Sequence, residues 1–253
     1  MKRSWDAPAY HHVSGLMDSL SVEVLDRLIL EGNETVLDAG CGTGRITALL
    51  LERLPRGNVI AVDADEAMID QARRNLDDER VIVKRLDLLA LGLDQDVDAV
   101  FSTATLHWVL DHDRLFGNLF SALRPGGQLV AQFGGAGNIN ALLRAAHATA
   151  AAPEYAPWLQ NFVADWYFPG LDETRRRLER VGFQHTRCWR QSFRVEPDDP
   201  ITYLETIPLG SWVQLLPEDR RRDFTEAVAD RLGTPLTVDY IRLNVDATRP
   251  ALS

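Results

Sequence analysis

The stretch VLDAGCGTG, from Val36 to Gly44, decides how this chain is organised. Apolar residues lead into one acid, Asp38, and glycines then occupy positions 40, 42 and 44. Glycine adopts positive φ angles readily and lets the main chain approach a ligand closely. Exposed N–H groups at the start of a following helix favour anions or polar groups. The stretch therefore predicts a strand, a ligand-contacting loop and a helix in succession.

Working outward from this loop, predicted strands and helices alternate between Ser19 and Gly134. Such alternation is typical of a parallel sheet that has right-handed crossovers and is covered on both faces. The predicted strands are 35–40, 58–65, 80–89, 97–106 and 128–134. The predicted helices are 19–30, 45–54, 66–76 and one that begins at Asp113 and is stopped by Pro125 and Gly126.

The C-terminal part has a different pattern. It contains a predicted helix at 173–183 and predicted strands at 187–195 and 238–247. The segment 197–236 is mostly helical and rich in Leu, Trp and Tyr, and 136–169 is of the same kind. We expect residues 1–253 to form one domain, with these two segments as insertions that cap the sheet.

Composition limits the possible partners. The 253 residues carry a formal net charge of −10, which argues against a broad nucleic-acid surface. Two scattered cysteines, Cys41 and Cys188, form neither a disulfide framework nor a metal cluster. The N-terminus lacks an apolar signal region, and no run approaches the ~20 apolar residues of a membrane span. We expect a soluble, cytoplasmic monomer or weak homodimer without membrane or nucleic-acid partners.

The glycine spacing restricts the ligand. A phosphate-binding P-loop requires a Lys after its glycines, and this loop has none. A dinucleotide loop has the spacing G-x-G-x-x-G, whereas this one is G-x-G-x-G and follows Asp38, whose charge would repel a pyrophosphate. The loop therefore favours a nucleoside-like ligand without phosphates.

Two further acids follow buried strands. Asp63 ends the second strand, where a carboxylate can accept hydrogen bonds from both ribose hydroxyls. Asp87 follows the third strand, where it can accept from an adenine amino group while Leu88 packs on the ring. A helix N-cap is the simpler alternative for an acid such as Asp63.

Five motifs together resemble the class I S-adenosylmethionine-dependent methyltransferases: VLDAGCGTGRIT, VIAVDADEAMIDQAR, RLDLLAL, VFSTATLHWV and LRPGGQLVAQF. The resemblance covers roughly residues 13–133. It implies S-adenosylmethionine as cofactor and S-adenosylhomocysteine as product. It also implies an α/β fold, a Rossmann-like, seven-stranded, mostly parallel sheet with helices on both faces and a helical cap. The last strand would lie antiparallel between its neighbours.

A narrower likeness points to the trans-aconitate methyltransferase group, whose relatives methylate carboxylates. It rests on TLHWV, on the segment from Trp5 to Tyr10 and on PGLDETRRRLERVGF. The C-terminal stretch DYIRLNVDATRP departs from that group's pattern, so the acceptor stays open.

The resemblance also assigns residues to roles. His107 is the candidate catalytic base, and Trp108, Tyr10 and Arg242 are candidates for the substrate pocket, with Arg194 and Arg249 as further candidates to hold a carboxylate. The expected cofactor-binding residues are Asp38, Ala39, Gly40, Gly42, Asp63, Ala64, Asp87, Leu88, Ser102, Thr103 and Tyr10.

Several other features have simpler interpretations. The acids of LHWVLDHD are expected to cap a helix at the surface, with no metal bound. The arginine runs 175–177 and 220–222 are expected to be solvated helix faces. Cys41 is expected to be a packing residue.

The sequence thus favours a small-molecule methyltransferase directed at a carboxylate or other oxygen. An NAD-binding oxidoreductase on a similar sheet is one alternative, and a non-catalytic S-adenosylmethionine-binding protein is the other.

Overall fold

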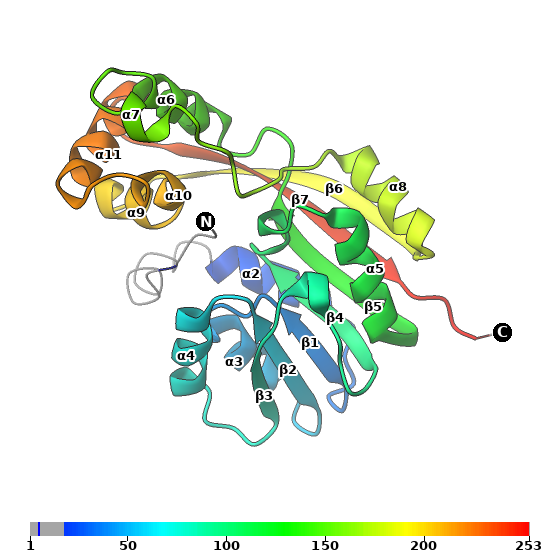
Figure 1. Ribbon diagram of the computed structural model, residues 1–253. Coiled ribbons are helices and arrows are strands. Elements are labelled where there is room, and N and C mark those ends of the chain that lie inside the picture. Colours follow the sequence, from blue (N-terminus) through cyan, green and yellow to red (C-terminus); the bar gives the residue numbers. More distant parts are fainter. Residues whose placement is uncertain (1–4, 6–17, 253) are drawn as a thin grey trace.

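The computed structural model describes Trp5 and residues 18–252, and these form one seven-stranded sheet in the order β3-β2-β1-β4-β5-β7-β6 (Figure 1). The first five strands are parallel, and β7 runs antiparallel between β5 and β6. The predicted topology is therefore confirmed. The strands are β1 (Thr35–Ala39), β2 (Asn58–Asp63), β3 (Val81–Arg85), β4 (Val97–Thr103), β5 (Leu123–Gly134), β6 (Gln184–Val195) and β7 (Val238–Thr248).

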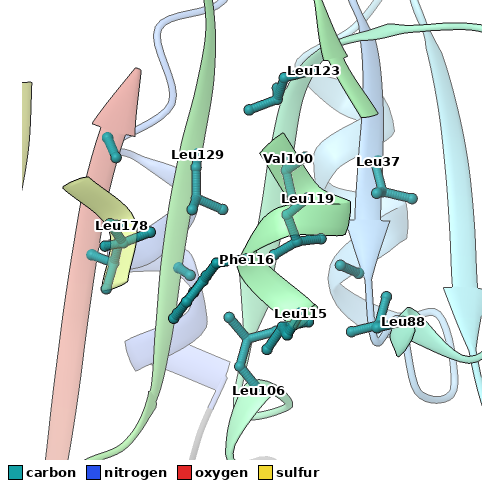
Figure 2. Packing of buried hydrophobic residues seen from close by; sticks show 14 of the residues in the cluster. Leu37, Leu88, Val100, Leu106, Leu115, Phe116, Leu119, Leu123, Leu129 and Leu178 are labelled. Atoms are coloured by element: carbon teal, nitrogen blue, oxygen red, sulfur yellow. The ribbon is translucent and has the colours of Figure 1, made fainter. Parts of the chain in front are cut away.

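Helices cover both faces of the sheet, as Figure 1 shows. On one face, α2 (Asp18–Leu25), α3 (Arg45–Glu52) and α4 (Glu66–Asn75) supply a buried cluster that includes Leu25, Leu50 and Ile69. On the other face, α5 (His112–Ala122) and α8 (Leu171–Val181) supply a second cluster (Figure 2). Because helices cover both faces, successive residues of β1 from Val36 to Ala39 are all buried, whichever face their side chains are on.

The remaining helices form a cap with its own core. They gather around the ends of β6 and β7 that extend beyond the other strands (Figure 1). Trp212 is fully buried there, and the ring of Phe162 stacks on it at 3.7 Å between centroids. Val195 and Val238 join this core from the two strands. The cap helices are α6 (Asn140–Ala150), α7 (Ala156–Leu159), α9 (Pro200–Thr206), α10 (Gly210–Val213) and α11 (Glu218–Leu232).

Several predicted boundaries differ from the structure by a few residues, and two of these differences have a clear local cause. The third strand ends at Arg85 rather than Leu89, because the Asp87 carboxylate accepts the Leu89 N–H at 2.9 Å and turns the chain into a short 3-10 helix, η2 (Leu88–Ala90). The helix expected to reach Pro125 ends at Ala122, because a residue that precedes proline disfavours the helical conformation. The chain from Leu123 onward is already strand β5.

The first helix is also shorter than predicted, ending at Leu25 instead of Leu30. Beyond it, the Arg27 guanidinium crosses to the sheet. It donates to Asp246 at 2.7 Å and to the main-chain oxygen of Ala131 at 3.0 Å. These bonds fasten the end of α2 to β5 and β7. Within the described part of the chain, every helix is too short or too polar to cross a bilayer.

The packing of α5 gives a direct test of this core. Leu119 is fully buried between α5 and the sheet (Figure 2). Truncation leaves a cavity in a close-packed interior, so Leu119→Ala is expected to lower the free energy of unfolding by about 3 kcal/mol in urea titrations. Ile29→Ala removes a side chain that is 83% exposed and should change it by less than about 0.5 kcal/mol. Equal losses in the two variants would contradict the described packing.

Candidate functional site

One cavity of about 910 Å³ lies at the carboxyl ends of the first four strands and continues beneath the cap. Its sheet-side wall is made by the loops after β1, β2, β3 and β4. Its cap-side wall is made by Asn138 and Ile139, by Asp165, Trp166 and Phe168, by Ile207 and Pro208, and by Tyr240 and Arg242 of β7. Ligand sites of open α/β sheets lie at this edge. The volume is at the upper end of the usual range for small-molecule pockets.

The glycine loop borders this cavity in backbone conformations that glycine favours. Gly40 and Gly42 have φ angles of +90° and +55°. A Cβ atom on Gly40 would lie 2.1 Å from Thr105, whose hydroxyl donates to the Gly40 carbonyl. A Cβ atom on Gly42 would meet nothing within 4 Å. Gly40 therefore allows close packing of the loop, whereas Gly42 leaves room for a ligand against the main chain.

Asp63 is fixed against this loop by its own carboxylate. One oxygen accepts the Gly42 N–H at 3.0 Å, and the other accepts the Asp65 N–H at 2.9 Å. Burial raises the pKa of Asp63, and these hydrogen bonds oppose the rise. A carboxylate oxygen accepts more than one hydrogen bond, so both oxygens can also receive a ligand's hydroxyls. The pair of anchored oxygens is suited to a vicinal diol.

Asp38 lies deeper in the same wall. Its carboxylate is buried and accepts a 2.6 Å hydrogen bond from the Thr47 hydroxyl. Burial raises the pKa of Asp38 to about 7; the Thr47 bond lowers it, and the nearby charge of Asp63 raises it further. A cationic group of a ligand placed here would draw Asp38 back toward its ionised form.

The other expected cofactor residues divide into two groups. Ala64, Asp87, Leu88 and Thr103 line the cavity together with Asp38, Gly40, Gly42 and Asp63. Ala39 and Ser102 do not line it. They are buried behind the loop, where the Ser102 hydroxyl donates to the Ala39 carbonyl at 2.6 Å. Tyr10 lies outside the described residues.

His107 and Trp108 occupy the 3-10 helix η3 (Leu106–Trp108) and line the cavity between the sheet and the cap. The Gly134 N–H donates to His107 Nδ1 at 3.2 Å. Because Nδ1 is the acceptor, the ring proton belongs on Nε2. The Trp108 ring meets Trp5 edge-on at 5.3 Å and Trp166 edge-on at 6.1 Å between centroids.

Of the three candidate arginines, only Arg242 reaches the cavity. It is nearly buried, and its guanidinium lies 4.9 Å from the centroid of the Tyr240 ring. Arg194 is exposed and pairs with Asp239 at 2.7 Å. Arg249 donates to the carbonyls of Phe120, Ser121 and Leu123, at the opposite edge of the sheet. Of the candidates, Arg194 and Arg249 thus lie outside the cavity.

Asp111, Arg177 and Cys41 make contacts that support the fold. Asp111 caps α5 by accepting the Arg114 N–H at 3.0 Å, as expected of a capping acid. Arg177, expected to be solvated, is instead largely buried and pairs with Glu173 at 2.9 Å, because α8 packs against α5. Cys41 is buried, and burial raises the pKa of its thiol strongly. The described residues contain no group of three or more His, Cys, Asp or Glu side chains able to hold a metal ion.

Sequence reasoning did not assign a site role to several cap residues that line the cavity. Most of these lie in segments of the cap, Tyr240 lies within the antiparallel strand β7, and Asn138 and Ile139 come several residues after the end of β5, so no acid or glycine directly at a strand end marks them. The aromatic content of the cap was the one available signal, and it did not separate wall from core. The residues are Asn138, Ile139, Asp165, Trp166, Phe168, Ile207, Pro208 and Tyr240.

Comparison with known proteins finds matches to the part of the chain that contains the glycine loop. Residues 36–127 match a family model described as a methyltransferase domain. The trans-aconitate 2-methyltransferase of Escherichia coli O1:K1 / APEC is 38% identical to this chain over 128 residues, which are 51% of this chain and 50% of that protein. The chain thus spans about half the length of the curated relatives it matches.

Solved structures share the fold. Haemonchus contortus phosphoethanolamine N-methyltransferase 2, solved with S-adenosyl-L-methionine, has a TM-score of 0.65 at 16% identity, covering 96% of this chain and 56% of that one. An S-adenosylmethionine-dependent methyltransferase from Mesorhizobium loti has a TM-score of 0.54 at 23% identity, covering 92% and 100%. Together with the family match, these likenesses confirm the resemblance predicted from the motifs.

The raised pKa of Asp38 predicts a pH-dependent contribution to stability. Between pH 4 and 7 the unfolded chain loses this proton while the folded chain keeps it, because the pKa is about 7 in the folded chain against an ordinary 3.8. Rising pH therefore destabilises the native protein at this site, and the effect is complete above pH 7. Asn has no proton to lose and can still accept from Thr47.

Urea unfolding of the native protein and of Asp38→Asn between pH 5 and 8 checks this expectation. The variant should gain stability relative to the native protein as the pH rises, and the difference should level off above pH 7. Other titrating groups are common to both proteins and cancel in the difference. A difference that stays constant with pH would contradict the assignment.

Proposed function

We propose that this chain, whose residues 36–127 match a methyltransferase-domain model, transfers a methyl group from S-adenosylmethionine to a carboxylate oxygen of a small molecule. The observation that carries the proposal is Asp63, whose two oxygens are anchored by main-chain N–H groups beside Gly42 in a cavity that continues under the cap. The methyltransferase match supports the reaction class, and the relatives named for trans-aconitate support a carboxylate acceptor.

The residues of the sheet-side wall fit this cofactor. Asp63 would receive the ribose hydroxyls, and Asp87 and Leu88 would receive the adenine. The open space beside Gly42 admits a ligand against the main chain. Asp38 and the carbonyl-rich ends of the strands suit the amine end, which is cationic. Ala39 and Ser102 would support the loop from behind, while Gly40, Ala64 and Thr103 line the cavity.

The protein's task in this reaction is mainly to align two ligands and to exclude water. When bound, the cofactor supplies a methyl group on a positively charged sulfur, so its leaving group is already activated. An ionised carboxylate needs no general base. Holding the reacting groups in line is worth roughly 7–11 kcal/mol. The cap supplies the walls that keep water from the acceptor side.

His107 is proposed as a hydrogen-bond donor to the acceptor rather than as a general base. Its Nδ1 accepts the Gly134 N–H, so Nε2 carries the proton and presents a donor. Arg242 is proposed as the cation that holds the carboxylate, since it lines the cavity from β7. Trp108 forms part of the pocket wall beside them.

We also propose that residues 1–253 act as one domain, with 136–169 and 197–236 as cap insertions. The support is continuity: β6 and β7 belong to the sheet and also end in the core of the cap. The sheet-side wall and the cap-side wall of the cavity would then belong to one rigid unit.

Cofactor binding tests the first half of the proposal. Titration calorimetry is expected to show saturable binding of S-adenosylmethionine and none of NAD or NADH. Asp63→Ala removes two charge-assisted hydrogen bonds to a ligand and should weaken binding at least 100-fold. Asp70→Ala, on the exposed surface of α4 at the same cavity, should stay within threefold. Asp63→Asn, with circular dichroism of all variants, controls for loss of the loop. Tight binding of NADH or unchanged affinity in Asp63→Ala would contradict the assignment.

Methyl transfer tests the second half. Labelled S-adenosylmethionine is incubated with panels of carboxylic acids, alcohols and amines, and products are identified by mass spectrometry. The expected product is a methyl ester. Because no general base is needed, the rate of its formation should not change with pH around neutrality. Cofactor binding without transfer to any panel member would favour a non-catalytic binding protein.

A further inference from the structure

We infer that the acceptor is a monocarboxylate with an aromatic or otherwise apolar body, and that tricarboxylates such as trans-aconitate are poor substrates. This inference rests on the proposed function and names the substrate class of the same site. It follows from the charges and the surfaces of the cap-side wall, the part of the cavity that the strand-end motifs do not describe.

The charge lining the cavity is the first observation. Among the described residues that line it, seven are acids and three are arginines. Arg85 pairs with Glu66 at the outer end of β2 and β3, and Arg45 opens α3 behind the glycine loop. Arg242 is thus the one arginine that the described residues contribute to the cap-side wall. Since each buried carboxylate requires a cation or several donors, this wall suits one ligand carboxylate and not three.

Asp165 further favours a monocarboxylate over a tricarboxylate. It lines the cap-side wall, and both of its oxygens lie within hydrogen-bond distance of the Ser211 hydroxyl, at 2.8 and 2.9 Å. The hydroxyl holds the carboxylate in place without neutralising its charge. A second ligand carboxylate nearby would face a like charge in a site partly screened from water. Asp165 is therefore expected to weaken the binding of ligands that carry more than one carboxylate.

The walls between these charged groups are aromatic and aliphatic. Trp166 meets Trp108 edge-on, and Phe168 lies 5.6 Å from His107 between ring centroids. Ile139, Ile207 and Pro208 line the same side. Such surface gains free energy by covering an apolar ligand, at roughly 25 cal/mol per Å² removed from water. It offers few partners to the multiple oxygens of a tricarboxylate.

These aromatic rings are held by the fold. A Cβ atom on Gly134 would lie 2.5 Å from the Phe168 ring, so the glycine makes the space that this ring occupies. Trp166 packs on Phe162, which stacks on the buried Trp212 of the cap core. The aromatic wall is therefore packed against both the sheet and the cap. Moving these rings to admit a small polar ligand would disrupt that packing.

The reaction itself favours an apolar site for this acceptor. In the transfer, a bond forms between the carboxylate oxygen and the methyl carbon while the carbon–sulfur bond breaks and leaves its electron pair on sulfur. An anion and a cation thereby become a neutral ester and a neutral thioether, with no proton, oxidant or reductant needed. Surroundings of low polarity stabilise separated charges least, so they favour a step in which charge disappears.

The test compares 3-phenylpropanoate with trans-aconitate on the full chain bound to S-adenosylhomocysteine. Trp5, Trp108 and Trp166 line the cavity, so tryptophan fluorescence reports its occupancy independently of activity. 3-Phenylpropanoate is expected to bind at least tenfold more tightly than trans-aconitate. With S-adenosylmethionine it should give methyl 3-phenylpropanoate, at a kcat/KM at least tenfold above that for trans-aconitate.

Paired variants assign the effect to residues. Arg242→Gln should weaken 3-phenylpropanoate binding at least tenfold, whereas Arg194→Gln, at an exposed pair on the same sheet, should not. Asp165→Asn should narrow the affinity ratio between the two acids at least fivefold. Asp198→Asn, exposed and outside the cavity, should leave that ratio unchanged. Circular dichroism confirms folding of each variant.

The outcomes distinguish a failure of the inferred acceptor class from a failure of the proposed carboxylate methylation. Methylation of trans-aconitate in preference to 3-phenylpropanoate would overturn the inference and leave carboxylate methylation standing. An unchanged ratio in Asp165→Asn would overturn the discriminating role of that residue. Methylation of 3-phenylpropanol or 3-phenylpropylamine but of neither acid would overturn both the inference and the proposed carboxylate acceptor.

Discussion

The hydrogen bonds from Gly42 and Asp65 to the two oxygens of Asp63 are the constraint around which the site is arranged. They join the end of β2 to the loop after β1, so the loop cannot shift without breaking a partly buried, charge-assisted contact. The same bonds oppose the rise in the Asp63 pKa that burial produces. A carboxylate is thereby kept ready to receive hydroxyl groups at the edge of the sheet, and the glycines keep the neighbouring main chain accessible.

The cap adds what the sheet edge lacks. The sheet-side wall is acidic and polar, while the cap-side wall is aromatic with one arginine from the described residues. The two walls meet at η3 and at Gly134, where a main-chain N–H fixes the tautomer of His107. A solved structure named as an N-methyltransferase shares the fold at a TM-score of 0.65, so the fold alone does not identify the acceptor.

Much of the sheet and the loop could be predicted because their signals are local. Continuous apolar runs mark strands buried on both faces, and acids at strand ends share one edge of a parallel sheet. Features that depend on distant contacts could not be predicted in this way. The burial of Arg177 requires α8 to pack on α5, and the binding of Arg249 to carbonyls near Leu123 requires the antiparallel β7. Asp165 lines the cavity and accepts from the Ser211 hydroxyl, a contact between residues 46 positions apart in the sequence.

A crystal structure of the protein with S-adenosylhomocysteine and 3-phenylpropanoate would show whether the two walls of the cavity hold the two ligands. We expect the ribose hydroxyls on the two oxygens of Asp63, the adenine beside Leu88, and the carboxylate on Arg242 with its phenyl ring against Trp166. A nucleoside bound elsewhere, or a carboxylate placed away from Arg242 and outside the cap-side wall, would contradict this expectation.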